Sequence, residues 1–253
     1  MEKKYLDKFL KHISSAEKIY FISDIHFGCE HPDKEMEKIF LFKKILNRAR
    51  NNNIPVVLVG DIFDFLFDYG KLLDITQLPM LAELYWTVKE KGDLYYILGN
   101  HDFWGKELLE NFLGIPTSYN LAGEINHKKF WASHGETVEK NTPADKLFRW
   151  MLHNSFNISS FRLLYPRLAK LLARSISHMS RGHSSKLNYS FDKYIQFARK
   201  KWDQGLDYVI LAHLHQPFIY SENHKYLIIT GDWLIHRTML VYSKGRFYHE
   251  VLN

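Results

Sequence analysis

The sequence predicts an α/β fold in which two β-sheets form a sandwich flanked by helices, with a helical cap inserted late in the chain. Three observations lead to this prediction. Short apolar runs alternate with segments of helical periodicity in the N-terminal half, turn-separated β runs fill the C-terminal part, and a basic helical segment interrupts the strands. We expect a single domain over 1–253, with the inserted cap at 140–203.

The N-terminal half predicts a largely parallel sheet, because its strands are almost continuously apolar and helical segments separate them. The first expected helix repeats apolar residues near the 3.6-residue period, and the second resembles it. The strands are expected at 18–23, 55–60 and 94–99, and the helices between them at 33–52 and 78–90. Two further strands of the same kind are expected at 129–133 and 207–212.

The C-terminal part predicts antiparallel strands joined by short turns. Turn signals at Glu222-Asn223 and Lys244-Gly245 separate these runs. The strands are expected at 218–221, 226–230, 239–243 and 247–251. Together with a hairpin around 123–131, they are expected to form a second sheet packed on the first.

The composition is that of a folded protein without a membrane span. A hydrophobic content of 46% and a mean hydropathy of −0.30 exclude a disordered chain. Apolar runs are far shorter than the ~20 residues that a spanning helix needs. The stretch from Met1 to Ile22 lacks the continuous apolar region of a secretory signal, and the single cysteine, Cys29, excludes an intrachain disulfide. These features favour a cytoplasmic protein.

The positive charge is concentrated in the predicted cap. The chain has 34 Lys and Arg against 28 Asp and Glu, yet residues 140–201 hold 13 basic and only two acidic side chains, a net +11. The remainder is net negative, which predicts an anionic partner for the cap. Within the cap an apolar stripe runs beside a basic one, formed by Leu168, Leu171, Leu172, Ile176 and Met179 and by Arg167, Lys170, Arg174 and Arg181. This stripe either packs the cap onto the body or binds an amphiphilic anion or a membrane interface.

Polar side chains directly follow five of the expected strands. Because ligands gather at the carboxyl ends of parallel strands, we expect these side chains to converge. Imidazole, carboxylate and amide groups suit divalent metals such as Mn, Fe or Zn. The seven candidate ligands are Asp24, His26, Asp61, Asn100, His134, His213 and His215. Seven ligands exceed the need of one ion, so we expect two metal positions with Asp61 as the bridge.

The order of these motifs resembles the calcineurin-like metallophosphoesterase superfamily. The resemblance implies a four-layer αββα fold and hydrolysis of phosphate esters and anhydrides by two divalent ions. It assigns one metal to Asp24, His26, Asp61 and His215, and the other to Asp61, Asn100, His134 and His213. It also implies catalytic roles for Asn100, His101 and Asp102, with His101 facing the scissile phosphate. Asp64 and Asp102 would orient histidines, or else serve as ordinary turn or capping carboxylates.

Further residues are similar to the UDP-2,3-diacylglucosamine diphosphatase family of lipid A synthesis. They are Phe63-Asp64-Phe65, Phe103-Trp104, Pro217, Gly231-Asp232-Trp233 and the basic insertion. The resemblance implies manganese-dependent cleavage of a lipid-linked nucleotide to UMP and 2,3-diacylglucosamine 1-phosphate, at the inner membrane surface. Glu136, Ala212 and Leu214 depart from the usual residues but remove no ligand. Expected substrate-binding residues, all in the cap, are Leu171, Leu172, Arg181, Ser184 and Lys186; the last three are equally compatible with solvated surface groups.

Two other classes of function stay open at this point. A nuclease or nucleotide phosphodiesterase would use the basic segment to follow a nucleic-acid backbone. The leucines and isoleucine of the stripe favour acyl chains over stacked bases, so no nucleic-acid partner is expected. A non-catalytic scaffold would purify without stoichiometric metal, and the intact ligand set with His101 argues against it. No obligate protein partner is inferred.

Overall fold

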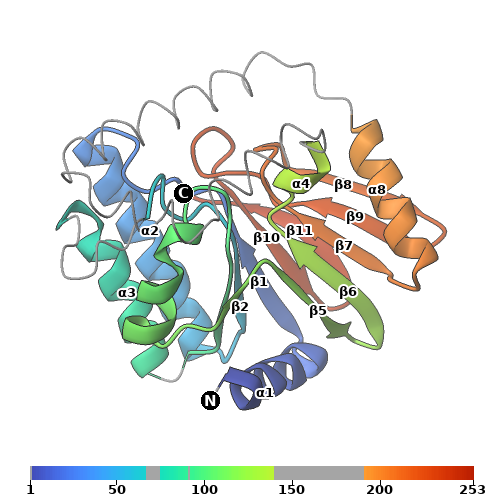
Figure 1. Cartoon of the computed structure of the whole chain (residues 1–253), viewed down its shortest axis with the longest axis horizontal. Coiled ribbons are helices and arrows are strands. Elements are labelled where there is room, and N and C mark those ends of the chain that lie inside the picture. Colours follow the sequence, from blue (N-terminus) through green and yellow to red (C-terminus); the bar gives the residue numbers. More distant parts are fainter. Residues whose placement is uncertain (1, 67–74, 91, 140–190) are drawn as a thin grey trace, which may run out of the picture.

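The computed structural model describes residues 2–66, 75–90, 92–139 and 191–253. Two β-sheets pack face to face, with α2 (Pro32–Asn51) and α3 (Leu78–Lys89) on one outer side and α8 (Asp192–Asp203) on the other (Figure 1). The predicted α/β sandwich of two sheets flanked by helices is thereby confirmed. Most of the expected cap at 140–203 lies outside the described residues, and its described end forms α8.

The first sheet has six strands and contains the predicted parallel core. Its order is β11-β10-β1-β2-β3-β4. The parallel strands are β1 (Lys18–Ile22), β2 (Val56–Val59), β3 (Leu94–Ile97) and β4 (Thr117–Ser118). The antiparallel strands beside β1 are β10 (Thr238–Ser243) and β11 (Arg246–Val251). Helices α2 and α3 connect β1 to β2 and β2 to β3, as expected.

The second sheet has five strands in the order β5-β6-β7-β9-β8. Strands β6, β7 and β9 are parallel, whereas β5 and β8 lie antiparallel at the two edges. The strands are β5 (Asn120–Ile125), β6 (Lys128–Ser133), β7 (Tyr208–Leu211), β8 (Phe218–Glu222) and β9 (Lys225–Ile229).

The expected division of strands between the sheets was wrong in two respects. Strand β7 belongs to the second sheet, where it pairs with β6 of the expected hairpin. Strands β10 and β11 return to the first sheet, because β10 pairs with β1. The apolar pattern of a strand shows that it is buried on both faces but does not show which neighbour it pairs with.

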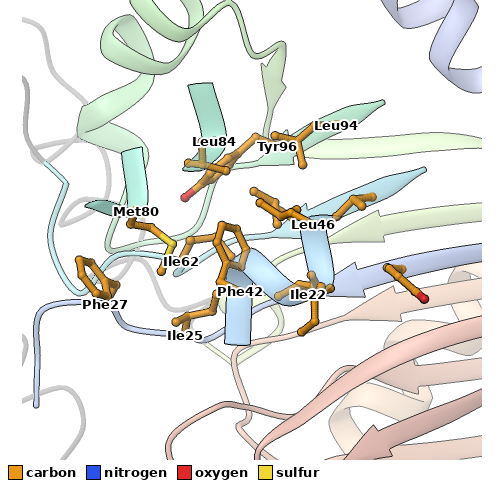
Figure 2. Close-up of a cluster of buried hydrophobic side chains, with 14 of the residues drawn as sticks. Ile22, Ile25, Phe27, Phe42, Leu46, Ile62, Met80, Leu84, Leu94 and Tyr96 are labelled. Carbon is orange, nitrogen blue, oxygen red and sulfur yellow. The ribbon is translucent and has the colours of Figure 1, made fainter. Parts of the chain in front are cut away.

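Alternate side chains of the strands enter different cores. In β1, Ile19 and Phe21 lie between the two sheets, whereas Tyr20 and Ile22 lie on the side of α2. Figure 2 shows this outer cluster, in which helix residues such as Phe42 and strand residues such as Ile22 meet. The period of two means that the central strands are buried on both faces. Polar side chains that could take part in a reaction therefore lie at the ends of these strands.

Helix α1 (Glu2–Ser15) was not expected from the sequence. Its Phe9 and Ile13 enter the core between the sheets. Gly123 of β5 allows the helix to approach closely, since a Cβ there would lie 2.8 Å from Leu10 Cδ2. The remaining short helices are η1 (Ile75–Gln77), η2 (Phe103–Gly105), η3 (Leu108–Leu113) and α4 (Glu136–Glu139). Within the described ranges, no helix is long and apolar enough to span a bilayer.

Candidate metal centre

The candidate ligands come from the carboxyl ends of parallel strands in both sheets. Asp24 and His26 follow β1, Asp61 follows β2 and Asn100 follows β3. The second sheet contributes the residues after its central strands, with His134 after β6 and both His213 and His215 after β7. The two sheets thus contribute to one centre at the same end of the sandwich, as the sequence predicts.

The backbone bends sharply at most of these positions. Five candidate ligands have positive φ: Asp24 (51°), His26 (47°), Asp61 (52°), His213 (70°) and His215 (58°). This region is sparsely populated by residues other than glycine, and each instance costs of order 1–3 kcal/mol. The bends of adjacent loops are joined by backbone hydrogen bonds, for example from Asp24 N to Gly60 O at 3.1 Å. Interactions of the surrounding fold compensate for this strain, and the side chains are thereby held at the centre.

Two glycines let the ligand loops pack against one another. A Cβ on Gly99 would lie 2.1 Å from Asp61 Oδ1, and one on Gly60 would lie 2.6 Å from His134 Nδ1. Each glycine precedes a candidate ligand in its motif. The motifs therefore contain glycine because the next loop occupies the place of a side chain.

The ligand atoms form two adjoining groups that share Asp61. In position 1, Asp24 Oδ1 lies 3.5 Å from His215 Nε2 and 3.8 Å from His26 Nε2, which is itself 3.8 Å from Asp61 Oδ2. In position 2, Asp61 Oδ2 lies 3.1 Å from His134 Nε2, which is 3.3 Å from His213 Nδ1. Asp24, His26 and His215 lie close enough to hold one ion, as do Asp61, His134 and His213. His26, Asp61 and His101 form a further group of this kind.

Buried atoms without hydrogen bonds support a metal at this centre. Three atoms of the centre, Asp24 Oδ1, His26 Nε2 and Asn100 Oδ1, are among those in the described residues that are shielded from solvent and make no hydrogen bond. A buried polar atom without a partner carries a desolvation penalty of about 1–3 kcal/mol. Since all three atoms belong to predicted ligands, a divalent cation fits the donor set.

The mutual electrostatics of the ligands point the same way. Burial by itself raises the pKa of Asp61, but His134 and His101 hold it well below its usual range. Burial lowers the pKa of His26, yet the carboxylates of Asp24 and Asp64 raise it to about 9. The carboxylates of this centre thus favour positive charge, which a metal supplies once the histidines are neutral.

A sequence profile of the calcineurin-like phosphoesterases matches residues 17–217. The chain belongs to the calcineurin-like phosphoesterase family. Members of this family use divalent metals, in agreement with the clusters of histidine and aspartate described above.

Curated relatives of this phosphoesterase align over most of its length. The UDP-2,3-diacylglucosamine hydrolase of Porphyromonas gingivalis is 25% identical over 247 residues, which cover 89% of this chain and 94% of the relative. The enzyme of the same name from Vibrio cholerae is 25% identical, with coverage of 90% and 96%. Among solved structures, an archaeal phosphodiesterase aligns over 93% of this chain and 99% of its own, with 14% identity and a TM-score of 0.45.

His101 of this phosphoesterase lies beside the two metal positions. Its Nδ1 donates to the carbonyl oxygen of Asp64 at 2.7 Å, and its Nε2 lies 3.8 Å from Asp61 Oδ2. Its backbone N–H also donates to Asp61 Oδ1 at 3.0 Å. Burial lowers the pKa of the imidazole, although Asp61 opposes this. The ring is thus fixed with Nε2 toward the centre.

The two aspartates expected to orient histidines lie in different surroundings. Asp64 Oδ1 is 3.5 Å from His26 Nδ1, consistent with an orienting contact. Asp102 is fully buried and accepts hydrogen bonds from Gly99 N, Ile62 N and the Tyr96 hydroxyl. Its carboxylate joins the loops after β2 and β3, as expected of the alternative in which Asp102 is a turn or capping carboxylate. Burial, reinforced by Asp61, raises its pKa to about 7.

Asp232 is a further residue of the centre that the sequence did not predict. It is fully buried after β9, and its Oδ2 lies 3.4 Å from His215 Nδ1. A polar pair after a buried strand, Gly231-Asp232, repeats the pattern of Gly60-Asp61, so the signal that would have identified it was present. The substrate-binding residues expected in the cap lie outside the described part of the chain: Leu171, Leu172, Arg181, Ser184 and Lys186.

Proposed function

We propose that this phosphoesterase hydrolyses the diphosphate of UDP-2,3-diacylglucosamine, giving UMP and 2,3-diacylglucosamine 1-phosphate. The observation that supports the hydrolytic chemistry is the convergence of histidines and aspartates on adjoining groups that could hold divalent metal. Support for the substrate comes from relatives named UDP-2,3-diacylglucosamine hydrolase, which align along about nine tenths of the chain.

Two divalent cations, manganese in this proposal with iron or zinc as alternatives, fit the donor set. Position 1 would be held by Asp24, His26, Asp61 and His215, and position 2 by Asp61, Asn100, His134 and His213. When bound, such ions polarise phosphoryl oxygens and make a water molecule more acidic.

The protein's own contribution to the reaction centres on Asp61 and His101. Asp61 contacts ligands of both positions, so its carboxylate keeps them adjacent. The bond from His101 Nδ1 to the Asp64 carbonyl leaves Nε2 as the nitrogen directed at the substrate phosphate. A proton on Nε2 stabilises the charge on a phosphoryl oxygen and can pass to the leaving oxygen.

The remaining parts of the substrate would be bound by the cap. In this proposal Leu171 and Leu172 contact the acyl chains, while Arg181, Ser184 and Lys186 contact phosphate. Each buried methylene stabilises binding by about 0.8 kcal/mol. A substrate with two acyl chains resides in a membrane, so the protein would act as a peripheral protein at the inner membrane surface.

Hydrolysis in ¹⁸O-labelled water tests the proposed reaction. Attack on the nucleotide-proximal phosphorus places the label in UMP, as mass spectrometry of the products would show. Label found only in 2,3-diacylglucosamine 1-phosphate would refute this position of attack, and failure to cleave the substrate would refute the assignment itself. Unlabelled UMP incubated with the enzyme in the same water controls for exchange.

A nucleic-acid or nucleotide phosphodiesterase is the alternative, favoured by the net charge of +11 over residues 140–201. Phosphate-backbone binding weakens steeply with salt, whereas acyl-chain binding depends on chain length. Cleavage of matched long-chain and short-chain substrates at low and high salt therefore separates the two activities. A preference for the long chain that persists at high salt supports the lipid substrate.

A further inference from the structure

The two histidines at the centre of position 1 each face a second, buried carboxylate. His26 Nδ1 lies 3.5 Å from Asp64 Oδ1, and His215 Nδ1 lies 3.4 Å from Asp232 Oδ2. The two rings stack with their centroids 5.0 Å apart. In position 2, by contrast, His134 Nδ1 donates to a neutral group, the carbonyl oxygen of Val59, at 2.9 Å.

These different partners affect how strongly each position attracts a cation. A carboxylate behind a histidine ligand fixes the ring and makes the coordinating nitrogen more basic. It also adds negative charge in a site sheltered from water, where charges interact strongly. Around position 1 lie the carboxylates of Asp24, Asp61, Asp64 and Asp232. At position 2, Asp61 Oδ2 lies 3.1 Å from His134 Nε2.

Asp232 itself is held firmly by its own loop. Its carboxylate accepts hydrogen bonds from Ile235 N at 3.1 Å and His236 N at 2.8 Å, and His236 Nδ1 lies 3.0 Å from the same oxygen as His236 N. The preceding glycine is required, because a Cβ on Gly231 would lie 2.2 Å from Thr238 Oγ1.

The same loop also supports a second ligand of position 1. Trp233 N donates to the backbone oxygen of Asp24 at 3.1 Å, so adjacent residues of the loop hold Asp24 and His215. This loop follows the segment 17–217 that matches the family profile. Asp232 therefore lies outside the segment that the family profile matches.

We infer that Asp232 is a positioning residue that makes position 1 the tighter of the two metal positions, so that the centre fills in order, position 1 first. The inference rests on the metal centre of the proposed function and on no particular substrate. With Nδ1 of His215 donating to Asp232, Nε2 is the nitrogen left to coordinate, and it already faces Asp24 Oδ1.

Titration of the metal-free full-length protein with Mn²⁺ alone tests this order. Calorimetry and electron paramagnetic resonance should show two separate affinities, with a mononuclear signal at the first equivalent. The Asp232→Asn variant should weaken the first affinity by about 10–100-fold and leave the second unchanged. His134→Ala assigns the two events, because it should remove the second equivalent and retain the tight one.

Asp207→Asn is the matched control. Asp207 also accepts a backbone hydrogen bond, from Lys129 N at 2.8 Å, but precedes β7 and so lies at the far end of that strand from His213. This variant should bind Mn²⁺ like the wild type. Equal affinities in the wild type, or an unchanged first affinity in Asp232→Asn, would overturn the inference.

A second measurement covers the possibility that Asp232→Asn does not fold. In the wild-type protein loaded with Zn²⁺, ¹⁵N spectra of labelled histidines should show His215 protonated at Nδ1 and metal-bound at Nε2. Coordination through Nδ1 would overturn the inference. Both measurements are made without substrate, so a wrong substrate assignment would leave their outcome unchanged.

Discussion

Five candidate ligands adopt a backbone conformation that glycine would adopt with less strain. Asp24, His26, Asp61, His213 and His215 all combine positive φ with a polar side chain at the metal centre. Aspartate and histidine tolerate this region better than most residues, but not without strain. The chemistry of the side chain thus prevails over the local preference of the backbone.

His101 should act on the substrate without holding metal. The His101→Ala variant is expected to retain both metal equivalents while the turnover number falls by about 10²–10⁴-fold, the usual range for a general acid. Metal analysis and steady-state kinetics on the same preparation check this. His127→Asn, at an exposed turn, is the control and should leave both properties unchanged. Loss of metal in His101→Ala would make His101 a ligand instead.

Gly99 should be intolerant of even one added methyl group. In Gly99→Ala the new Cβ would collide with Asp61 Oδ1 and with Asp61 N, 2.6 Å away. Overpacking of this kind destabilises by about 1–3 kcal/mol, and because Asp61 must move, metal affinity should fall as well. Urea unfolding and Mn²⁺ titration measure the two effects.

The Gly245→Ala variant is the control that separates backbone strain from a steric collision of the new Cβ. Gly245 has φ of +81° but open space around it, so alanine there should destabilise by about 1–2 kcal/mol and leave metal binding intact. If Gly99→Ala behaved in the same way, the close approach of Gly99 to Asp61 would not matter for the centre.

The sequence led to the seven candidate ligands because each follows an apolar strand as a polar residue that the strand does not need. It left the role of Asp102 open between catalysis, the orientation of histidines and a turn or capping carboxylate, because a carboxylate in a motif looks the same in each case. Asp232 was missed as a functional residue because its strand was expected in an antiparallel sheet. The rule that ligands gather at the carboxyl ends of strands applies to parallel sheets.

Elements of different sheets are joined by a half-buried histidine. His249 of β11 donates from Nε2 to the carbonyl oxygen of Ile229 in β9 at 2.7 Å. Burial lowers the pKa of His249, which the hydrogen bond to Ile229 partly offsets and His236 reinforces. The folded protein therefore favours neutral His249 more than the unfolded chain does.

This pKa shift predicts a loss of stability in mild acid. Below the unfolded pKa of about 6.5 the unfolded chain binds more protons than the folded one. As the pH is lowered, the free energy of unfolding therefore decreases, until the pH lies below the folded pKa as well. In His249→Gln, whose amide can still donate, this contribution should vanish. The difference in unfolding free energy between the two proteins, from urea titrations between about pH 5 and 7.5, should therefore vary with pH. A constant difference would contradict the prediction.

The sequence predicted the positions of elements well where burial determines them. It predicted them poorly where they depend on which strands pair. Strands β1, β2, β3 and β7 lie within their expected ranges because four-residue apolar cores mark them. Helix α1 was missed, although Tyr5, Phe9 and Ile13 recur at helical spacing. The sheet to which β10 belongs depends on contact with distant β1, and no local pattern encodes that contact.

At the scale of the whole molecule, the segment that matches the family is not a complete folding unit. It ends at residue 217, before β8 to β11. Without them β7 would lose its partner β9, and β1 would lose its partner β10. The cores on both sides of the sandwich would then be open to water.

A chain ending at Pro217 should therefore fail to unfold cooperatively. Circular dichroism during heating is expected to show a broad transition without a baseline of native structure. Removal of the exposed Asn253 alone is the control and should preserve the sharp transition of the full chain. A cooperative transition in the shortened chain would show that the last four strands are dispensable.

The pairing of β1 with β10 also bears on how the protein is made. On the ribosome, β1 emerges early and β10 near the end, so one edge of β1 waits for its partner while most of the chain is synthesised. At about 5–20 residues per second this interval lasts roughly ten to forty seconds. An open apolar strand edge is a template for pairing with other chains. The nascent protein thus passes through a period in which this edge of β1 is open to pairing with other chains.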